Sequence, residues 1–280
     1  MILKTIDLYD YYGIPRPTGE KVGGRLDVYV PRKRQTTRAP GMLILPGGAY
    51  HGIAEHEGAP IAMEWMRYGY HCFVLTYSVA PQVYPTQLLE ASLAMRYIRE
   101  TEEEYGTDPA HVAAVGFSAG AHLTATLASV ATNREIREIL GETTELAIPN
   151  AVVLSYGVVS YDAGITHMGT FKNLTGNRPE LFEYVDPVRM LTSASAPAFL
   201  WHTRRDQGVP FRNSVNYALR CDELGIPCEL HVYDRGFHGL GLATPAAVGD
   251  GAEESAATWP MLAETWLRNV LGFRIITPDK

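Results

Sequence analysis

The segment Gly116-Phe117-Ser118-Ala119-Gly120 constrains the fold of this chain more than any other. Residues 111–115 before it form a short apolar run typical of a strand, and residues 122–132 after it are rich in alanine and leucine and favour a helix. A serine on such a tight turn takes a strained backbone conformation, which the flanking glycines permit because they lack a Cβ. Its hydroxyl then projects at the helix N-terminus, where backbone N–H groups can bind a developing oxyanion. The segment predicts a nucleophilic Ser118, and the alternative is a glycine-rich turn with an incidental serine.

Two further polar residues follow later predicted strands. Asp206 comes shortly after the apolar run 196–200, and His238 comes shortly after residues 229–233. Open α/β sheets place their chemistry at the carboxyl ends of their strands, so both side chains are expected at the same edge as Ser118. The chain order serine, aspartate, histidine is that of the α/β-hydrolase triad and differs from the orders of chymotrypsin and subtilisin.

The loop Pro46-Gly47-Gly48-Ala49-Tyr50 follows another predicted strand, residues 42–45. Lipases and esterases carry a glycine-rich loop at this place, whose backbone N–H groups complete the oxyanion hole. Small residues are needed there because the backbone itself must approach the tetrahedral intermediate. The alternative is a plain Pro-Gly turn.

Together these motifs resemble α/β-hydrolase esterases of the hormone-sensitive-lipase type, and more closely the bacterial acetylesterase and acetylxylan-esterase-like proteins. The resemblance covers residues 26–271. It rests on the following motifs of this chain: Pro46-Gly47-Gly48-Ala49-Tyr50, Asp108-Pro109, Gly116-Phe117-Ser118-Ala119-Gly120-Ala121-His122-Leu123, Phe199-Leu200-Trp201-His202-Thr203, Asp206-Gln207-Gly208-Val209-Pro210 and Gly236-Phe237-His238-Gly239-Leu240-Gly241-Leu242.

The resemblance implies a role for each site residue. Ser118 is the expected nucleophile, Asp206 the acid that orients the imidazole, and His238 the general base. The expected donors to the oxyanion are the backbone N–H groups of Gly48, Ala49 and Ala119. The pair Arg204-Arg205 departs from the pattern, because acidic or small residues commonly precede the aspartate.

Strand-like and helix-like segments alternate along the 280 residues. Strands are predicted at 25–30, 42–45, 72–77 and 150–156, and helices at 61–68, 86–105, 211–224 and 256–270. Such alternation predicts a mostly parallel central sheet with helices on both faces, here as a single α/β-hydrolase domain over residues 1–280 with a small or absent cap. Residues 160–194 interrupt the pattern and are a candidate lid or site wall, the alternative being an ordinary surface connection.

Composition excludes several classes of function. The chain has 24 Lys and Arg against 31 Asp and Glu, a net charge of −7 without charged blocks, which argues against a nucleic-acid partner. No apolar run reaches the length of a membrane span, and residues 1–10 lack the apolar region of a secretory signal. Cys72, Cys221 and Cys228 are expected to be free thiols, which fits a cytoplasmic protein.

The sequence thus predicts a serine carboxylesterase for short acyl esters, chiefly acetyl esters, with sugars or xylo-oligosaccharides as candidate alcohols. We expect a small-molecule ester as the partner and neither a metal nor an organic cofactor, and the oligomeric state stays open. Four aromatic residues are candidates for contacting the substrate, with core packing as the alternative: Tyr50, Tyr77, Tyr156 and Phe237. An arylformamidase or other amidase, a small-substrate peptidase, and a non-catalytic ligand-binding protein of the same fold are the alternative functions.

Overall fold

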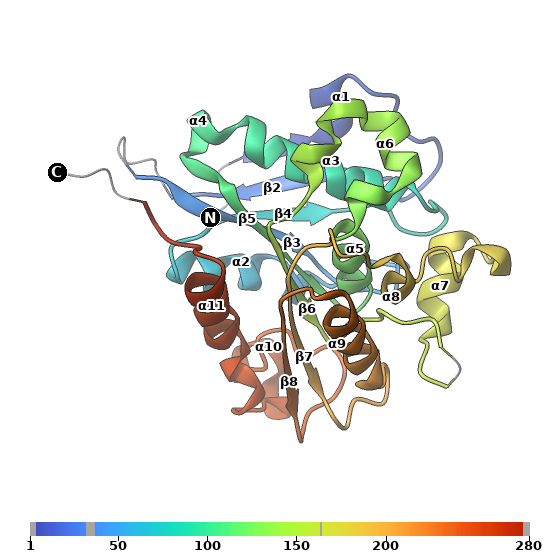
Figure 1. The fold of residues 1–280 in the computed structure, drawn as a ribbon, viewed down its shortest axis with the longest axis vertical. Helices are drawn as coiled ribbons and strands as arrows, with labels where there is room; N and C mark the ends of the chain where they lie inside the picture. Colours follow the sequence, from blue (N-terminus) through green and yellow to red (C-terminus); the bar gives the residue numbers. More distant parts are fainter. Residues whose placement is uncertain (1–3, 32–36, 163, 277–280) are drawn as a thin grey trace.

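A computed structural model describes residues 4–31, 37–162 and 164–276. Within them the chain forms an eight-stranded sheet in the order β1-β2-β4-β3-β5-β6-β7-β8 (Figure 1). The strands are β1 Lys4–Asp7, β2 Arg25–Tyr29, β3 Ala39–Leu45, β4 His71–Thr76, β5 Thr107–Phe117, β6 Ala151–Ser155, β7 Ala198–Thr203 and β8 Cys228–Tyr233. The pairs β1–β2 and β2–β4 are antiparallel, and every other neighbouring pair is parallel.

Helices cover both faces of this sheet. They are α1 Leu8–Tyr12, α2 Ala59–Arg67, α3 Thr86–Glu100, α4 Glu102–Tyr105, α5 Ala119–Leu127, α6 Arg134–Leu140, α7 Met168–Thr175, α8 Pro187–Met190, α9 Arg212–Leu224, α10 Pro245–Val248 and α11 Trp259–Val270. Short 3-10 turns lie at η1 Glu55–Glu57, η2 Val130–Thr132, η3 Gly141–Ala147, η4 Pro179–Leu181, η5 Gly249–Gly251 and η6 Ala256–Thr258. Figure 1 shows α2 and α11 on one side of the sheet and α3, α5 and α9 on the other.

The central strands are buried on both faces, which explains their uninterrupted apolar runs. Alternate residues of β3 point to opposite layers. Met42 and Ile44 pack in the same cluster as Trp65 of α2, whereas Leu43 and Leu45 pack in the cluster that includes residues of α3. Each strand residue therefore contributes to one of two apolar layers, and the sheet is held rigidly between them.

The predicted strands and the parallel arrangement are confirmed, but two helices differ from the prediction. The helix expected over 86–105 is divided at Thr101, whose φ of −100° and ψ of 22° leave the helical region while its Oγ1 bonds the carbonyl of Tyr97 at 2.7 Å. The helix expected over 122–132 begins earlier, at Ala119, and ends at Leu127. A 3-10 turn over Val130–Thr132 then replaces its last part.

The turn between β5 and α5 depends on a close approach of the backbone to the end of β3. A Cβ at Gly120 would overlap the carbonyl oxygens of Leu45 and Pro46, and a Cβ at Gly116 would overlap the carbonyl of Gly120. The first turn of α5 thus lies directly against the loop that follows β3. This contact brings two of the predicted functional segments together.

We expect Gly120→Ala to lower the free energy of unfolding by about 3 kcal/mol or more, because the clash is with backbone that cannot swing aside. Gly52→Ala is the matched control, since no heavy atom lies within 4 Å of a Cβ at Gly52. That variant should stay within about 0.5 kcal/mol of the parent chain in urea unfolding. Equal stability of the two variants would contradict the close approach.

Candidate active site

Ser118 occupies the sharp turn between β5 and α5. Its φ of 51° and ψ of −114° lie in a region that a residue with a side chain rarely adopts. Hydrogen bonds hold this conformation in place. The Ser118 N–H donates to the carbonyl of Ser155 at 3.0 Å, and the Ser118 carbonyl accepts from the N–H groups of His122 and Val158 at 3.1 and 3.2 Å. The strain predicted for this serine is therefore present and supported from β6 and its following loop.

The structure brings the three predicted triad residues into one hydrogen-bonded chain. Ser118 Oγ lies 2.7 Å from His238 Nε2, and His238 Nδ1 lies 2.7 Å from Asp206 Oδ2. The Asp206 side chain is fully buried, whereas 27% of the His238 side chain is exposed. The serine thus faces a partly open site and the aspartate lies behind the imidazole.

The environment of Asp206 keeps its carboxyl group ionised. Burial alone would raise its pKa, but hydrogen bonds from His202 and His238, together with the backbone N–H of Val209, hold the pKa well below its usual range. An ionised carboxylate only accepts hydrogen bonds, so His238 must carry its proton on Nδ1. His238 Nε2 is then free to accept the proton of the Ser118 hydroxyl.

His202 is a polar residue of this site that the sequence prediction missed. Its side chain is fully buried, and its Nε2 lies 2.8 Å from the Val209 carbonyl and 3.4 Å from Asp206 Oδ2. Its Nδ1 lies 2.8 Å from Ser214 Oγ. His202 therefore fixes the loop that carries Asp206.

The loop after β3 lies against Ser118. A Cβ at Gly47 would come within 3.0 Å of the Ser118 Cβ. Gly48, Ala49 and Tyr50 follow with φ values of 125°, 55° and 54°. Within the described part of the chain, nothing accepts a hydrogen bond from the N–H of Gly48, Ala49 or Ala119. Three unpaired donors in the two loops around the serine can bind an oxygen that gains negative charge.

Of the four aromatic candidates for substrate contact, the structure exposes only Phe237, at 47%. Tyr50, Tyr77 and Tyr156 are each at most 1% exposed, so no face of these rings is left for a sugar or an acyl group. Their hydroxyls bind protein atoms instead. Tyr77 donates to the Pro46 carbonyl at 2.5 Å, and Tyr50 donates to His122 Nδ1 at 3.0 Å. These three tyrosines therefore pack in the core, which was the alternative to substrate contact.

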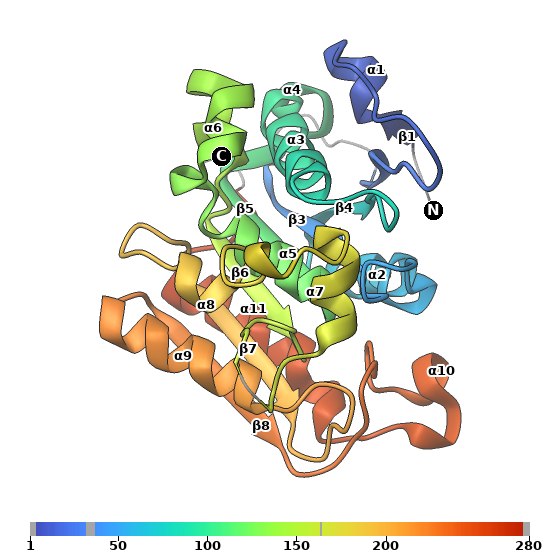
Figure 2. The same cartoon turned by 90° about the vertical axis from the view of Figure 1, so that its right-hand side faces the viewer.

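The excursion over residues 160–194 is tied to the loop after β3. Asn173 of α7 donates from Nδ2 to the carbonyl of Ala49 at 2.9 Å. The Phe171 ring lies edge-on to His122 of α5, with ring centroids 5.4 Å apart, and Figure 2 shows α7 beside α5. His122 Nε2 also donates to the carbonyl of Val185 at 2.9 Å. These contacts hold residues 171, 173 and 185 of this excursion against α5 and the loop after β3.

The two arginines that depart from the family pattern share one partner. Arg204 donates from Nη2 to Asp234 Oδ1 at 2.6 Å, and Arg205 donates from Nη2 to Asp234 Oδ2 at 3.3 Å. All three side chains are more than half exposed. Asp234 therefore balances one of the two positive charges beside the Asp206 loop.

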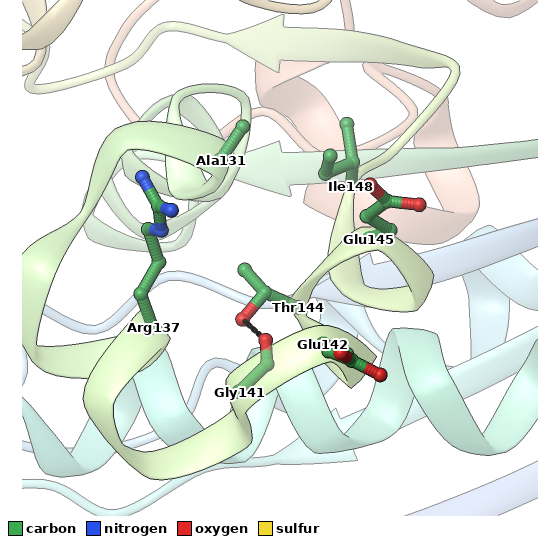
Figure 3. Close-up of a pocket in the computed structure, with 7 residues that line it drawn as sticks. All are labelled: Ala131, Arg137, Gly141, Glu142, Thr144, Glu145 and Ile148. Atoms are coloured by element: carbon green, nitrogen blue, oxygen red, sulfur yellow. Dashed lines mark hydrogen bonds between the residues drawn. The ribbon is translucent and has the colours of Figure 1, made fainter.

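A pocket of about 800 Å³ lies away from these loops, at the corner of α6 and η3 (Figure 3). It is lined by Ala131, Arg137, Gly141, Glu142, Thr144, Glu145 and Ile148. Its charged groups are of both signs, and none of its residues comes from the loops that carry the triad.

Among residues 4–31, 37–162 and 164–276, no group of three or more His, Cys, Asp or Glu side chains is placed to hold a metal ion. In the same part of the chain, no helix has the length and apolar character needed to cross a bilayer.

Comparison with known proteins gives the same grouping as the motifs. The model of the BD-FAE family matches residues 26–220. Endo-1,4-beta-xylanase B of Butyrivibrio fibrisolvens is 33% identical over an alignment of 213 residues that covers 72% of this chain and 32% of the xylanase. Acetylxylan esterase of Xylanibacter ruminicola is 26% identical over 77% of this chain and 44% of the esterase. The chain thus spans less than half the length of either relative.

Solved structures match over nearly the whole fold. An acetyl ester-xyloside bifunctional hydrolase from Caldicellulosiruptor lactoaceticus superposes with a TM-score of 0.82 at 30% identity, covering 97% of both chains. The carboxylesterase Cest-2923 of Lactobacillus plantarum superposes with a TM-score of 0.78 at 28% identity, covering 89% of this chain and 94% of that one. The expected fold and the resemblance to acetylxylan-esterase-like proteins are confirmed.

We expect acid to destabilise the protein partly through His122. Burial lowers the pKa of this imidazole from 6.5 to about 4, against a smaller opposing effect of its bond to Val185. Between pH 6.5 and about 4, His122 is therefore protonated in the unfolded chain and neutral in the folded chain. The contribution of His122 to the free energy of unfolding is fully present above pH 6.5. It falls by about 3 kcal/mol as the pH is lowered to about 4.

Urea unfolding across that pH range tests this with His122→Gln, which should be less stable at pH 7 but should lose less stability on acidification. The exposed His51 provides the control His51→Gln, whose stability at pH 7 should stay within about 0.5 kcal/mol of the parent chain. An unchanged pH dependence in His122→Gln would contradict the prediction.

Proposed function

The chain belongs to the BD-FAE family and has the α/β-hydrolase fold, and from this premise we propose that it is a serine carboxylesterase for short acyl esters, chiefly acetyl esters. One observation carries the proposal: the hydrogen-bonded chain Ser118–His238–Asp206, beside three backbone N–H groups that have no partner among the described residues. Similarity to an acetylxylan esterase and to an acetyl ester-xyloside hydrolase supports sugars or xylo-oligosaccharides as the alcohol.

In the first step Ser118 Oγ attacks the ester carbonyl while its proton passes to His238 Nε2, 2.7 Å away. The Asp206 carboxylate holds the imidazole in the required tautomer and stabilises the imidazolium. The carbonyl oxygen gains negative charge and is met by the N–H groups of Gly48, Ala49 and Ala119. Collapse of the intermediate transfers the proton from His238 to the leaving alcohol and leaves an acyl group on the serine.

The second step repeats the same proton path with water. His238 Nε2 takes a proton from a water molecule as its oxygen attacks the acyl carbonyl, and the oxyanion forms again in the same place. Breakdown of this intermediate returns the proton to Ser118 Oγ and releases the carboxylic acid. These residues supply the nucleophile, the base and the oxyanion donors of both steps.

We also propose a cytoplasmic location. Cys72, Cys221 and Cys228 are all unpaired, and the first two are buried. Free cysteines are common where the cell keeps thiols reduced. The charge pattern and composition agree with a small-molecule ester as the partner, without nucleic acid or membrane.

We expect Ser118→Ala to lower kcat on nitrophenyl acetate by about a thousandfold or more, because the nucleophile of both steps is removed. The fold should persist, and circular dichroism provides that control. A fluorophosphonate probe should label the parent chain and leave the variant unlabelled. Hydrolysis at the parental rate by the folded variant would overturn the proposal.

We expect nitrophenyl acetate or butyrate to be preferred over octanoate, since the wall over residues 160–194 is short and is fixed through Asn173 and Val185. Each methylene left unburied forgoes about 0.8 kcal/mol, and a methylene that clashes costs more. A panel of nitrophenyl esters, acetylated xylo-oligosaccharides and N-formylkynurenine measures the preference. A kcat/KM that climbs steadily to octanoate would indicate a lipase, and turnover of N-formylkynurenine alone would indicate an amidase.

A further inference from the structure

Glu57 is a buried carboxylate beside the site for which the proposed mechanism has no role. It ends the short turn η1, and only 2% of the residue is exposed. Its Oε2 accepts a hydrogen bond from the N–H of Gly47 at 2.7 Å, and its Oε1 accepts from the hydroxyl of Tyr156 at 2.5 Å. Burying a carboxylate costs free energy unless its oxygens are paired, so these two contacts must be made for the fold to keep it there.

The two partners of Glu57 belong to the two halves of the site. Gly47 lies against Ser118 and precedes the N–H groups proposed for the oxyanion. Tyr156 follows β6, and its ring lies edge-on to the ring of His238 with centroids 5.2 Å apart. The Tyr156 hydroxyl also accepts from the N–H of Gly241, three residues beyond His238, at 2.8 Å. A single carboxylate therefore joins the oxyanion loop to the loop of the base.

The turn η1 makes a second tie to the base loop. His56 Nε2 lies 3.0 Å from the carbonyl of Gly239, which follows His238 directly, and a carbonyl can only accept. His56 and Glu57 thus reach two points of the chain just after His238, His56 at Gly239 and Glu57 through Tyr156 at Gly241. Neighbouring residues of one turn fix this loop at two points.

The hydrogen-bond directions require a carboxylate at position 57. The Tyr156 oxygen already accepts from Gly241, so its proton is directed at Glu57. The Gly47 N–H is also a donor, and both oxygens of Glu57 therefore act as acceptors. A glutamine at this position would direct its amide N–H₂ at either the Gly47 N–H or the Tyr156 hydroxyl. Two donors would then face each other in the interior, and neither would have an acceptor.

We propose that Glu57 is a positioning residue that, through Gly47 and Tyr156, sets the spacing between the oxyanion donors and His238. This inference rests on the proposed esterase function. In the transition state, the base and the oxyanion donors must both lie at the correct distance from the reacting carbonyl. A misplacement of about 1 Å can lower the rate by about a hundredfold. Loss of the Glu57 contacts should therefore affect the transition state more than the binding of the ester.

The test compares Glu57→Gln and Tyr156→Phe with the control Asp108→Asn. Asp108 is also a buried carboxylate that accepts one backbone N–H, from Ala110 at 3.0 Å, and one side-chain donor, His111 Nδ1 at 2.7 Å. It lies at the start of β5, whereas Ser118 follows the end of that strand. Urea unfolding of every variant shows how much of any loss of activity comes from a lower stability of the fold.

With nitrophenyl acetate, Glu57→Gln should lower kcat by about 10- to 100-fold and change KM by less than about threefold. Tyr156→Phe keeps the ring on His238 and should lower kcat by about 10-fold, and the double variant should lose little more than Glu57→Gln because the two groups act as one unit. Asp108→Asn should keep kcat within about twofold. The inhibition constant of a trifluoromethyl ketone, which forms a tetrahedral adduct with the serine, should rise with the loss in kcat/KM in the two site variants only.

The outcomes separate this inference from the proposed function. If the parent chain hydrolyses no ester in the panel, the proposed function fails. If the parent chain and Asp108→Asn are active and a folded Glu57→Gln matches them in kcat and in inhibition, the positioning role is overturned. If Glu57→Gln does not fold, Tyr156→Phe decides in the same way, since it removes one hydroxyl and leaves the carboxylate in place.

Discussion

The site depends on the absence of a side chain at Gly120. Because that residue has no Cβ, the first turn of α5 reaches the carbonyl oxygens of Leu45 and Pro46 at the end of β3. The strained serine and the oxyanion loop are consequently held by the same backbone contact. Every other polar contact of the site adds to this arrangement by holding a loop that the sheet has already brought to the correct edge.

Three polar side chains outside the triad support the loops of the site. Tyr77 holds Pro46, Asn173 holds the carbonyl of Ala49, and His202 holds the loop of Asp206. Each of them is bonded to a backbone carbonyl, which has a fixed place, and this restricts the loops more firmly than contacts between mobile side chains. Residues far apart in the sequence thus hold the loops that carry the catalytic groups.

The sheet and the placement of Ser118, Asp206 and His238 could be predicted because each of these residues follows a strand-like segment, and parallel strands bring such positions to the same edge of the sheet. Glu57 could not, since it lies in a short polar turn without periodicity and looks like a surface residue. Its burial arises from contacts with Gly47 and Tyr156, which only the folded chain brings near. The break at Thr101 was missed for a related reason, because a local side-chain bond there competes with a continuous helical pattern.

The bond between Asn173 and Ala49 has a consequence for where this protein can be made. Asn173-Leu174-Thr175 has the sequence of an N-glycosylation acceptor, and the amide nitrogen that would carry the glycan is the atom that donates to the Ala49 carbonyl. A sugar attached there during passage through a eukaryotic secretory pathway would separate α7 from the oxyanion loop. Production in such a host therefore calls for replacement of Thr175, which abolishes the acceptor and leaves Asn173 free to make its contact.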